Sequence, residues 1–127
     1  MNEVVHFEVP ATNLARAKKF YSAVFEWELE DVPGMNYTMV RTIAVDKKTR
    51  MPKKPGAING GMMKKGGVFK APTLTVDVGN IDKAVVRVKK AGGKLAMKKQ
   101  KVMDMGYIAY VKDTEGNLVG IWETVKR

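Results

Sequence analysis

A chain of 127 residues with 45% hydrophobic side chains has the length and composition of one compact domain that buries its own core. The absence of cysteine excludes disulfides, thiolate metal sites and cysteine nucleophiles. No apolar run reaches the length of a membrane span, and Glu3 and Glu8 interrupt the first one. We therefore expect a cytoplasmic protein without a signal peptide or a membrane partner.

The net charge of +10 is unevenly distributed along the chain. Residues 1–45 hold 4 basic and 6 acidic side chains, whereas residues 46–127 hold 19 basic and 7 acidic ones. Such a basic surface attracts anionic ligands or nucleic acid, although a solvated lysine-rich surface is the alternative. The lysine pairs have no interleaved aromatic residues that would stack on bases, so we expect a small anion and not nucleic acid as the partner.

The first strand is predicted over residues 4–9 from its alternating pattern. Val5, Phe7 and Val9 share one side, and His6 and Glu8 share the other. The apolar side therefore packs on the following helix, which leaves the only histidine and a carboxylate on the open side of the strand.

A capped helix follows this strand. Pro10 ends the strand, and Thr12 or Asn13 can accept hydrogen bonds from the first free N–H groups of the helix. Apolar residues then recur at helical spacing from Leu14 to Val24.

Two further strands are predicted in the first half. Residues 37–43 alternate, with Tyr37, Met39 and Arg41 on one face. Residues 46–55 form an exposed basic loop, and a short strand over residues 56–63 follows. The pair Gly60 and Gly61 weakens this strand but admits close approach by backbone or ligand.

The second half repeats this plan after a linker at residues 64–71. A shift of 67 positions sets Asn13 on Asn80 and His6 on Thr73, and a shift of 60 positions sets Gly60 on Gly120. The second half also contains a helix that ends at Gly92 and Gly93. Three strands follow this helix, at residues 94–97, 107–111 and 118–123. We predict an α+β fold in which one domain, residues 1–127, contains tandem βαβββ modules at residues 1–65 and 71–127 around a shared cavity.

Three segments resemble the vicinal oxygen chelate superfamily, which includes glyoxalase I, extradiol dioxygenases and bleomycin-resistance proteins. They are VVHFEVPATNLARAKKFYSAVFEW at residues 4–27, GAINGGMM at residues 56–63 and VKDTEGNLVGIWE at residues 111–123. The resemblance implies the glyoxalase/bleomycin resistance/dioxygenase fold with a U-shaped, barrel-like cavity, and it implies a homodimer.

The resemblance also implies an incomplete metal site. The four ligand positions of metal-using members fall on His6, Gly60, Thr73 and Gly120, and only His6 is a good ligand. We therefore predict no metal or other cofactor, and no glyoxalase I activity, because that enzyme's glutamate is replaced by Gly120. The alternative is a displaced divalent metal site that uses Glu8, Asp77 or Glu123.

His6 and Glu8 are the candidate catalytic residues. They lie two positions apart on one strand, and a histidine with a pKa near neutrality can accept a proton. In the alternative interpretation, His6 is hydrogen-bonded without any chemistry, and Glu8 ties the two halves together through Thr75.

The remaining candidates are predicted to bind a ligand. Aromatic and thioether side chains would line the cavity beneath a few polar groups, and Arg41 would pair with an anion. The set is Tyr37, Met39, Arg41, Met62, Thr73, Thr75, Tyr107 and Trp122. The alternatives are that the apolar members form core and that Arg41 pairs with Glu26 or Glu28.

These residues favour a glyoxalase-related protein that binds a small anionic organic molecule and transfers a proton, as a lyase or isomerase does. One alternative is a sequestering protein of the bleomycin-resistance type, in which the same cavity binds without chemistry. A basic nucleic-acid accessory protein is a third interpretation, and it predicts binding that weakens steeply with salt.

Overall fold

The computed structural model describes residues 1–125 and has the predicted α+β fold. The chain divides into two compact units, and each is described by itself. The N-terminal unit is His6–Pro72, and the C-terminal unit contains Met1–Val5 together with the chain from Thr73 onward. The boundary follows directly after the predicted linker at residues 64–71.

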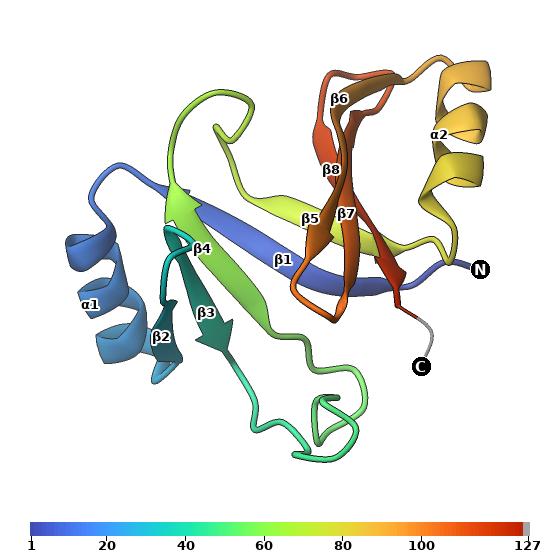
Figure 1. Ribbon diagram of the computed structural model, residues 1–127. Helices are drawn as coiled ribbons and strands as arrows, with labels where there is room; N and C mark the ends of the chain where they lie inside the picture. Colours follow the sequence, from blue (N-terminus) through green and yellow to red (C-terminus); the bar gives the residue numbers. More distant parts are fainter. Residues whose placement is uncertain (126–127) are drawn as a thin grey trace. The chain divides into compact units, whose positions relative to one another are not determined.

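The N-terminal unit is a four-stranded sheet with one helix. Its strand order is β2-β3-β4-β1, in which β1 and β4 run parallel and the other neighbours run antiparallel. Figure 1 shows α1 beside β2, β3 and β4. The elements are β1 (Val4–Ala11), α1 (Leu14–Phe25), β2 (Glu28–Val32), β3 (Tyr37–Arg41) and β4 (Gly60–Lys64).

The core of this unit lies between the sheet and α1. Ala11, Val40 and Met62 are its buried members. Trp27 closes one end, because its ring stacks on Tyr21 at 5.2 Å and contacts Phe7 at 5.6 Å between ring centroids. The alternation predicted for β1 is therefore confirmed, and the face that carries His6 and Glu8 is the face without the helix.

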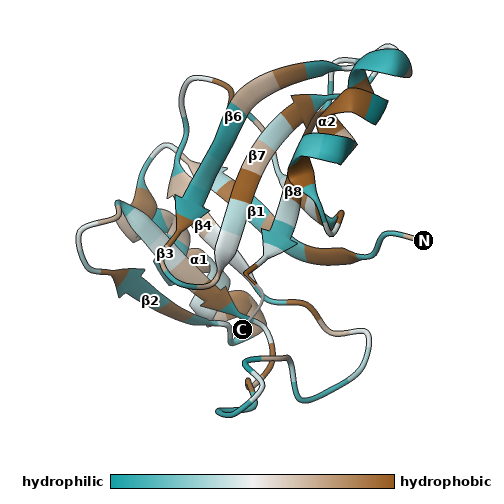
Figure 2. Ribbon diagram, turned by 45° about the vertical axis from the view of Figure 1, so that its right-hand side comes forward, coloured by the Kyte–Doolittle hydropathy of each residue, from teal (hydrophilic) through white to brown (hydrophobic). Residues whose placement is uncertain are grey.

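The C-terminal unit repeats this arrangement. Its strand order is β5-β8-β7-β6, with β5 and β8 parallel and the other neighbours antiparallel. Figure 1 shows α2 along one side of this sheet, and Figure 2 shows hydrophilic and hydrophobic residues alternating around α2. The elements are β5 (Thr73–Asp77), α2 (Ile81–Lys90), β6 (Lys94–Val102), β7 (Gly106–Lys112) and β8 (Leu118–Thr124).

Both helices begin at asparagine caps, as the repeat predicts. Asn13 Oδ1 accepts from the Arg16 N–H at 3.0 Å, and Asn80 Oδ1 accepts from the Lys83 N–H at 2.9 Å. A carboxylate adds to the second cap, because Glu123 Oε1 accepts from the Ile81 N–H at 2.8 Å. This acceptor satisfies one of the free donors at the start of α2.

The predicted strand limits differ from the observed ones in the first half. The predicted βαβββ module requires a strand at the place of β2, but no residue range was predicted for it. The strand β3 ends two residues earlier than expected, at Arg41. The cause of that early end is the side chain of Asn59, whose Oδ1 accepts from the N–H groups of Thr42 and Ile43 at 2.8 and 3.0 Å. These two donors are therefore unavailable to a neighbouring strand.

Within residues 1–125, neither helix has the length and apolar character that a membrane span requires.

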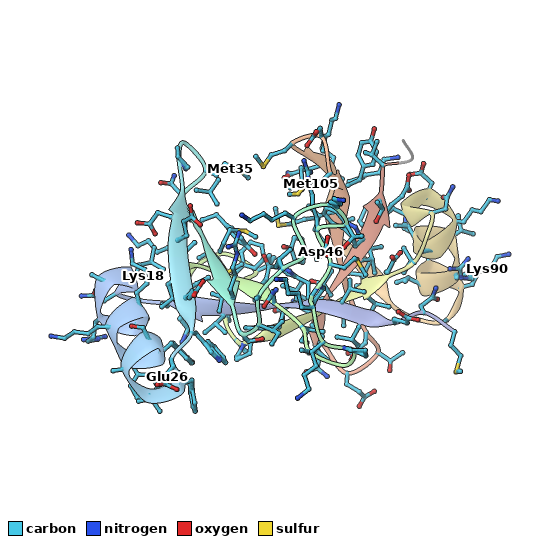
Figure 3. All side chains as sticks on the ribbon, turned by 90° about the horizontal axis from the view of Figure 1, so that it is seen from below. Lys18, Glu26, Met35, Asp46, Lys90 and Met105 are labelled. Atoms are coloured by element: carbon cyan, nitrogen blue, oxygen red, sulfur yellow. The ribbon has the colours of Figure 1, made fainter. Side chains whose placement is uncertain are left out.

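The end of α1 offers a simple stability test. Glu26, labelled in Figure 3, occupies the C-cap in the left-handed region, with φ 59°. Because glycine adopts this conformation without a Cβ clash, Glu26→Gly is expected to raise the free energy of unfolding by about 0.5–1 kcal/mol. Glu26→Ala removes the same charge but keeps the Cβ, and it is the matched control. Equal urea midpoints for the two variants would contradict a backbone origin.

Candidate functional site

The N-terminal unit connects His6, Tyr37 and Glu8 through two hydrogen bonds on the face without the helix. The Oη atom of Tyr37 lies 2.9 Å from Nε2 of His6 and donates to Oε2 of Glu8 at 2.8 Å. Two of these side chains come from β1 and the third comes from β3, two strands away in the sheet. The side chain of Glu8 is buried, with 5% of the residue exposed.

Gly61 allows Tyr37 to reach across the strand between β3 and β1. Glu8 pairs with Gly61 in the parallel ladder, so both lie on the same face of the sheet. A Cβ added at Gly61 would overlap the hydroxyl and ring of Tyr37. The close approach predicted for the glycine pair is therefore made at Gly61, and it is made by a tyrosine side chain.

Burial determines the protonation state of His6. Desolvation lowers the pKa of this imidazole from 6.5 to about 4, so the ring is neutral at pH 7. The prediction of a pKa near neutrality is wrong, because the sequence pattern does not show how much water the ring loses.

The hydrogen-bond directions then assign the tautomer of His6. With Glu8 ionised, the single hydroxyl proton of Tyr37 points to its carboxylate, and Oη then accepts the proton of His6 Nε2. The neutral ring therefore carries its hydrogen on Nε2 and its lone pair on Nδ1.

Met39 and Arg41 share the open face of β3 with Tyr37, as the alternation predicts. Arg41 is exposed, and its backbone lies beside that of Glu28 in the register of β2 and β3. Within residues 1–125 its guanidinium forms no ion pair with Glu26 or Glu28. The predicted alternative of such an ion pair is therefore wrong.

Two predicted ligand-binding residues lie in the cores instead. Met62 is completely buried beside Ala11 and Val40, on the α1 side of its sheet. Tyr107 packs against the α2-side core of the C-terminal unit, and the Lys99 ammonium lies 5.2 Å from its ring centroid. For both residues the alternative prediction, that they form core, is the correct one. Their strand registers direct their side chains toward the helices.

Thr73 and Thr75 lie on the face of β5 that points away from α2. Thr75 pairs with Gly120, and a Cβ added at Gly120 would contact the Thr75 hydroxyl. Thr75 is 1% exposed, and its hydroxyl has no hydrogen-bond partner within the described part of the C-terminal unit. A buried hydroxyl without a partner is a candidate contact for a ligand or water. The bond between Glu8 and Thr75 joins two units and stays a prediction.

Trp122 lies close to a glycine of a neighbouring strand, as Tyr37 does. Its side chain lies over Gly106 of β7, where an added Cβ would contact the indole ring. The indole N–H donates to the Thr124 hydroxyl at 2.9 Å. Each unit therefore holds an aromatic side chain close to a glycine on the helix-free face, where a Cβ would overlap it. Gly106 is not among the predicted site residues, although a glycine directly before a predicted strand was the available signal.

The donor atoms at the family's metal positions do not fit a divalent ion. Gly60 pairs with Phe7 on the helix side of the sheet, so the open-face position on β4 is Gly61 and not Gly60. Gly61 also offers no side chain, and the Nε2 of His6 is bonded to Tyr37. Within residues 1–125, no three histidine, aspartate or glutamate side chains gather as a ligand set.

Comparison with known proteins gives the family context. The model of the Glyoxalase/Bleomycin resistance protein/Dioxygenase superfamily matches residues 3–121. The chain is 28% identical over 123 residues to "Putative glyoxylase CFP32" of Mycobacterium tuberculosis and of Mycobacterium bovis. That alignment covers 91% of this chain but 43% of each relative, so the chain spans less than half of their length.

Solved structures show the same fold at low sequence identity. The hypothetical protein BH1468 from Bacillus halodurans C-125 has a TM-score of 0.65 and 13% identity, over 99% of this chain and 96% of its own. A Streptomyces coelicolor methylmalonyl-CoA epimerase in complex with 2-nitronate-propionyl-CoA has a TM-score of 0.66 and 10% identity, over 99% of both chains. These similarities concern the fold alone.

Proposed function

Because the chain belongs to the Glyoxalase/Bleomycin resistance protein/Dioxygenase superfamily, we propose that it binds a small organic anion and moves a proton through His6, Tyr37 and Glu8. The observation that carries the proposal is the continuous chain of hydrogen bonds, with Nε2 to Oη at 2.9 Å and Oη to Oε2 at 2.8 Å. The net charge of +10 favours an anionic ligand.

The lowered pKa of His6 defines how the proton moves. A histidine with a pKa of about 4 is a weak base if it must hold the proton itself. In the relay, Nδ1 accepts the substrate proton while Nε2 passes its own proton to Tyr37, whose hydroxyl proton moves to Glu8. The imidazole stays neutral overall, and the carboxylate of Glu8 becomes the final acceptor.

The proposed chemistry and the printed names of the relatives support one substrate class. Proton abstraction next to a carbonyl needs one base and an anchor for the acid group. Arg41 lies on the same face of β3 as Tyr37 and forms no ion pair within residues 1–125, so its planar guanidinium can hold a carboxylate. The epimerase among the structural relatives makes 2-substituted malonyl thioesters the first compounds to test.

Hydrogen exchange in D2O tests the relay with methylmalonyl-CoA as the first substrate. Loss of the α-proton signal in proton NMR measures the exchange rate. Tyr37→Phe keeps the ring but breaks both hydrogen bonds, so we expect exchange to slow about 100-fold or more while affinity changes only a few-fold. Tyr107→Phe, on the helix side of the other unit, is the matched control. Unchanged exchange in Tyr37→Phe would contradict the relay.

Sequestration without chemistry is the second candidate function. The observation that favours it is that Tyr37 uses its hydroxyl both as donor and as acceptor inside the unit, so the three polar groups already have partners without a ligand. This candidate predicts no exchange by the wild type and ligand affinity within a few-fold after His6→Ala. We propose that neither function needs a divalent metal, and the homodimer and the cytoplasmic location stay predictions.

A further inference from the structure

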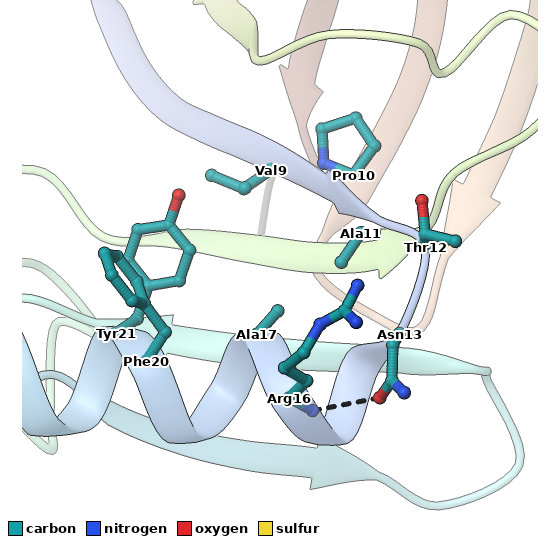
Figure 4. A pocket seen from close by; sticks show the side chains of 9 residues that line it. All are labelled: Val9, Pro10, Ala11, Thr12, Asn13, Arg16, Ala17, Phe20 and Tyr21. Carbon is teal, nitrogen blue, oxygen red and sulfur yellow. Dashed lines mark hydrogen bonds between the residues drawn. The ribbon is translucent and has the colours of Figure 1, made fainter.

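We propose that a groove between α1 and the end of β1 binds a small aromatic acid, at a site separate from His6, Tyr37 and Glu8. The groove has a volume of about 380 Å³, which lies in the range of small-molecule sites. Figure 4 shows the side chains that surround it. They are Val9, Pro10, Ala11, Thr12, Asn13, Arg16, Ala17, Phe20 and Tyr21.

The groove and the hydrogen-bonded site lie on opposite faces of the sheet. Val9 pairs with Met62, and both Met62 and Ala11 belong to the core beneath α1. His6 and Glu8 alternate with these residues along β1, so they point to the face without the helix. A ligand in the groove therefore reaches none of the groups of the proposed relay, and the two sites can be tested independently.

Arg16 gives the groove its preference for an anion. Its backbone N–H is used by the Asn13 cap, but its guanidinium forms no hydrogen bond or ion pair with any of residues 1–125. Figure 4 shows this guanidinium directed from α1 toward the end of β1. Among residues 1–125, no acidic side chain lines the groove, so a carboxylate or sulfonate would be the first negative charge beside Arg16.

Phe20 gives the groove its preference for an aromatic group. This residue is 54% exposed, although a phenyl ring gains free energy when it leaves water. Its ring meets Tyr21 edge to face at 5.2 Å, and Tyr21 in turn stacks on Trp27 at 5.2 Å. The aromatic wall is therefore supported from behind and can receive a flat ligand without rearrangement.

The spacing of the two side chains defines the shape of the ligand. Arg16 and Phe20 are four residues apart in α1, so they are neighbours on one face of the helix, with Cβ atoms about 5–6 Å apart. A molecule that places an anionic group beside one aromatic ring matches this separation. The flanking Pro10 and Ala17 add apolar contact.

Fluorescence titration with 8-anilinonaphthalene-1-sulfonate tests the proposal, because this probe combines a sulfonate with aromatic rings. We expect Arg16→Gln and Phe20→Ser each to weaken binding about fivefold to tenfold. Two controls lie outside the groove. Lys19→Gln removes the same charge from α1, and Val86→Ser removes an apolar side chain of α2 that is 52% exposed. Both controls, and His6→Ala, should bind within twofold of the wild type.

Several outcomes would overturn this assignment. Equal weakening by Arg16→Gln and Lys19→Gln would mean that the probe responds only to net charge. Equal weakening by Phe20→Ser and Val86→Ser would mean that the probe binds any exposed apolar side chain. Sedimentation velocity adds an independent result, because a dimer that dissociates in Phe20→Ser would mean that a second copy covers the groove. Circular dichroism of each variant verifies that α1 is intact before its affinity is interpreted.

Discussion

Lowering the pH from 6.5 to 4 is expected to reduce the free energy of unfolding by on the order of 3 kcal/mol through His6 alone. Above pH 6.5 the imidazole is neutral in both states, so it adds no pH dependence. Between pH 6.5 and 4 the unfolded chain binds a proton that the folded protein does not, and stability falls as the pH falls. Below about pH 4 both states are protonated, and the loss levels off.

The matched variant for this prediction is His6→Gln, which keeps a hydrogen-bond donor near Tyr37 but does not titrate. Urea unfolding measured at half-unit pH intervals should give a slope for the wild type and a nearly flat line for the variant. Hydrogen bonds lower the pKa values of Asp31, Asp46 and Asp113 below 3.8, so these groups affect stability at lower pH. Parallel curves for the two proteins between pH 6.5 and 4 would contradict the buried neutral imidazole.

Gly61→Ala is expected to destabilise the protein by about 2–4 kcal/mol and to separate the three bonded side chains. The added methyl group would occupy the space of the Tyr37 hydroxyl, so the ring must turn away. The carboxylate of Glu8 and the imidazole of His6 then lose that hydrogen-bond partner. Both the urea midpoint and the imidazole signals of the only histidine should change.

Two comparisons make this prediction specific. Gly66→Ala adds the same methyl group where no atom of the described residues lies within 4 Å, and it should change stability by less than about 0.5 kcal/mol. In a background of Tyr37→Ala the methyl group meets no ring, so the cost of Gly61→Ala should nearly vanish. An equal cost with and without the tyrosine ring would show that the clash is made with something else.

Alternation along single strands is the part of the fold that sequence predicts best. It correctly predicts that His6 and Glu8 lie on the other face of β1 from Phe7, and that Tyr37 lies on the other face of β3 from Val40. The reason is that the side-chain period of a strand is fixed at two. The asparagine caps are also predictable, since side chains that accept from the first turn are few. These local rules were sufficient to predict a two-module α+β fold.

Pairing between strands is where sequence reasoning fails. A shift of 60 positions sets Gly60 on Gly120, but the ladders set Glu8 opposite Gly61 and Thr75 opposite Gly120, which corresponds to a shift of 59. A slip of one residue exchanges the two faces of a strand. The same one-residue error led to the prediction that Met62 lines the cavity, whereas the residue lies in the core. The bridge through Tyr37 depends on a contact across an intervening strand, and no local pattern shows it.

The first five residues have a consequence for any attempt to divide the gene. Met1–Val5 belong to the C-terminal unit, where the Glu3 carbonyl accepts from the Asp77 N–H at 2.9 Å, although the rest of β1 belongs to the N-terminal unit. A fragment that ends before Thr73 would still contain Met1–Val5, which belong to the C-terminal unit. The complementary fragment would lack these five residues. The duplicated halves of the sequence are therefore not separable parts, and a circular permutant that opens the chain at residues 64–71 keeps every residue that either unit needs.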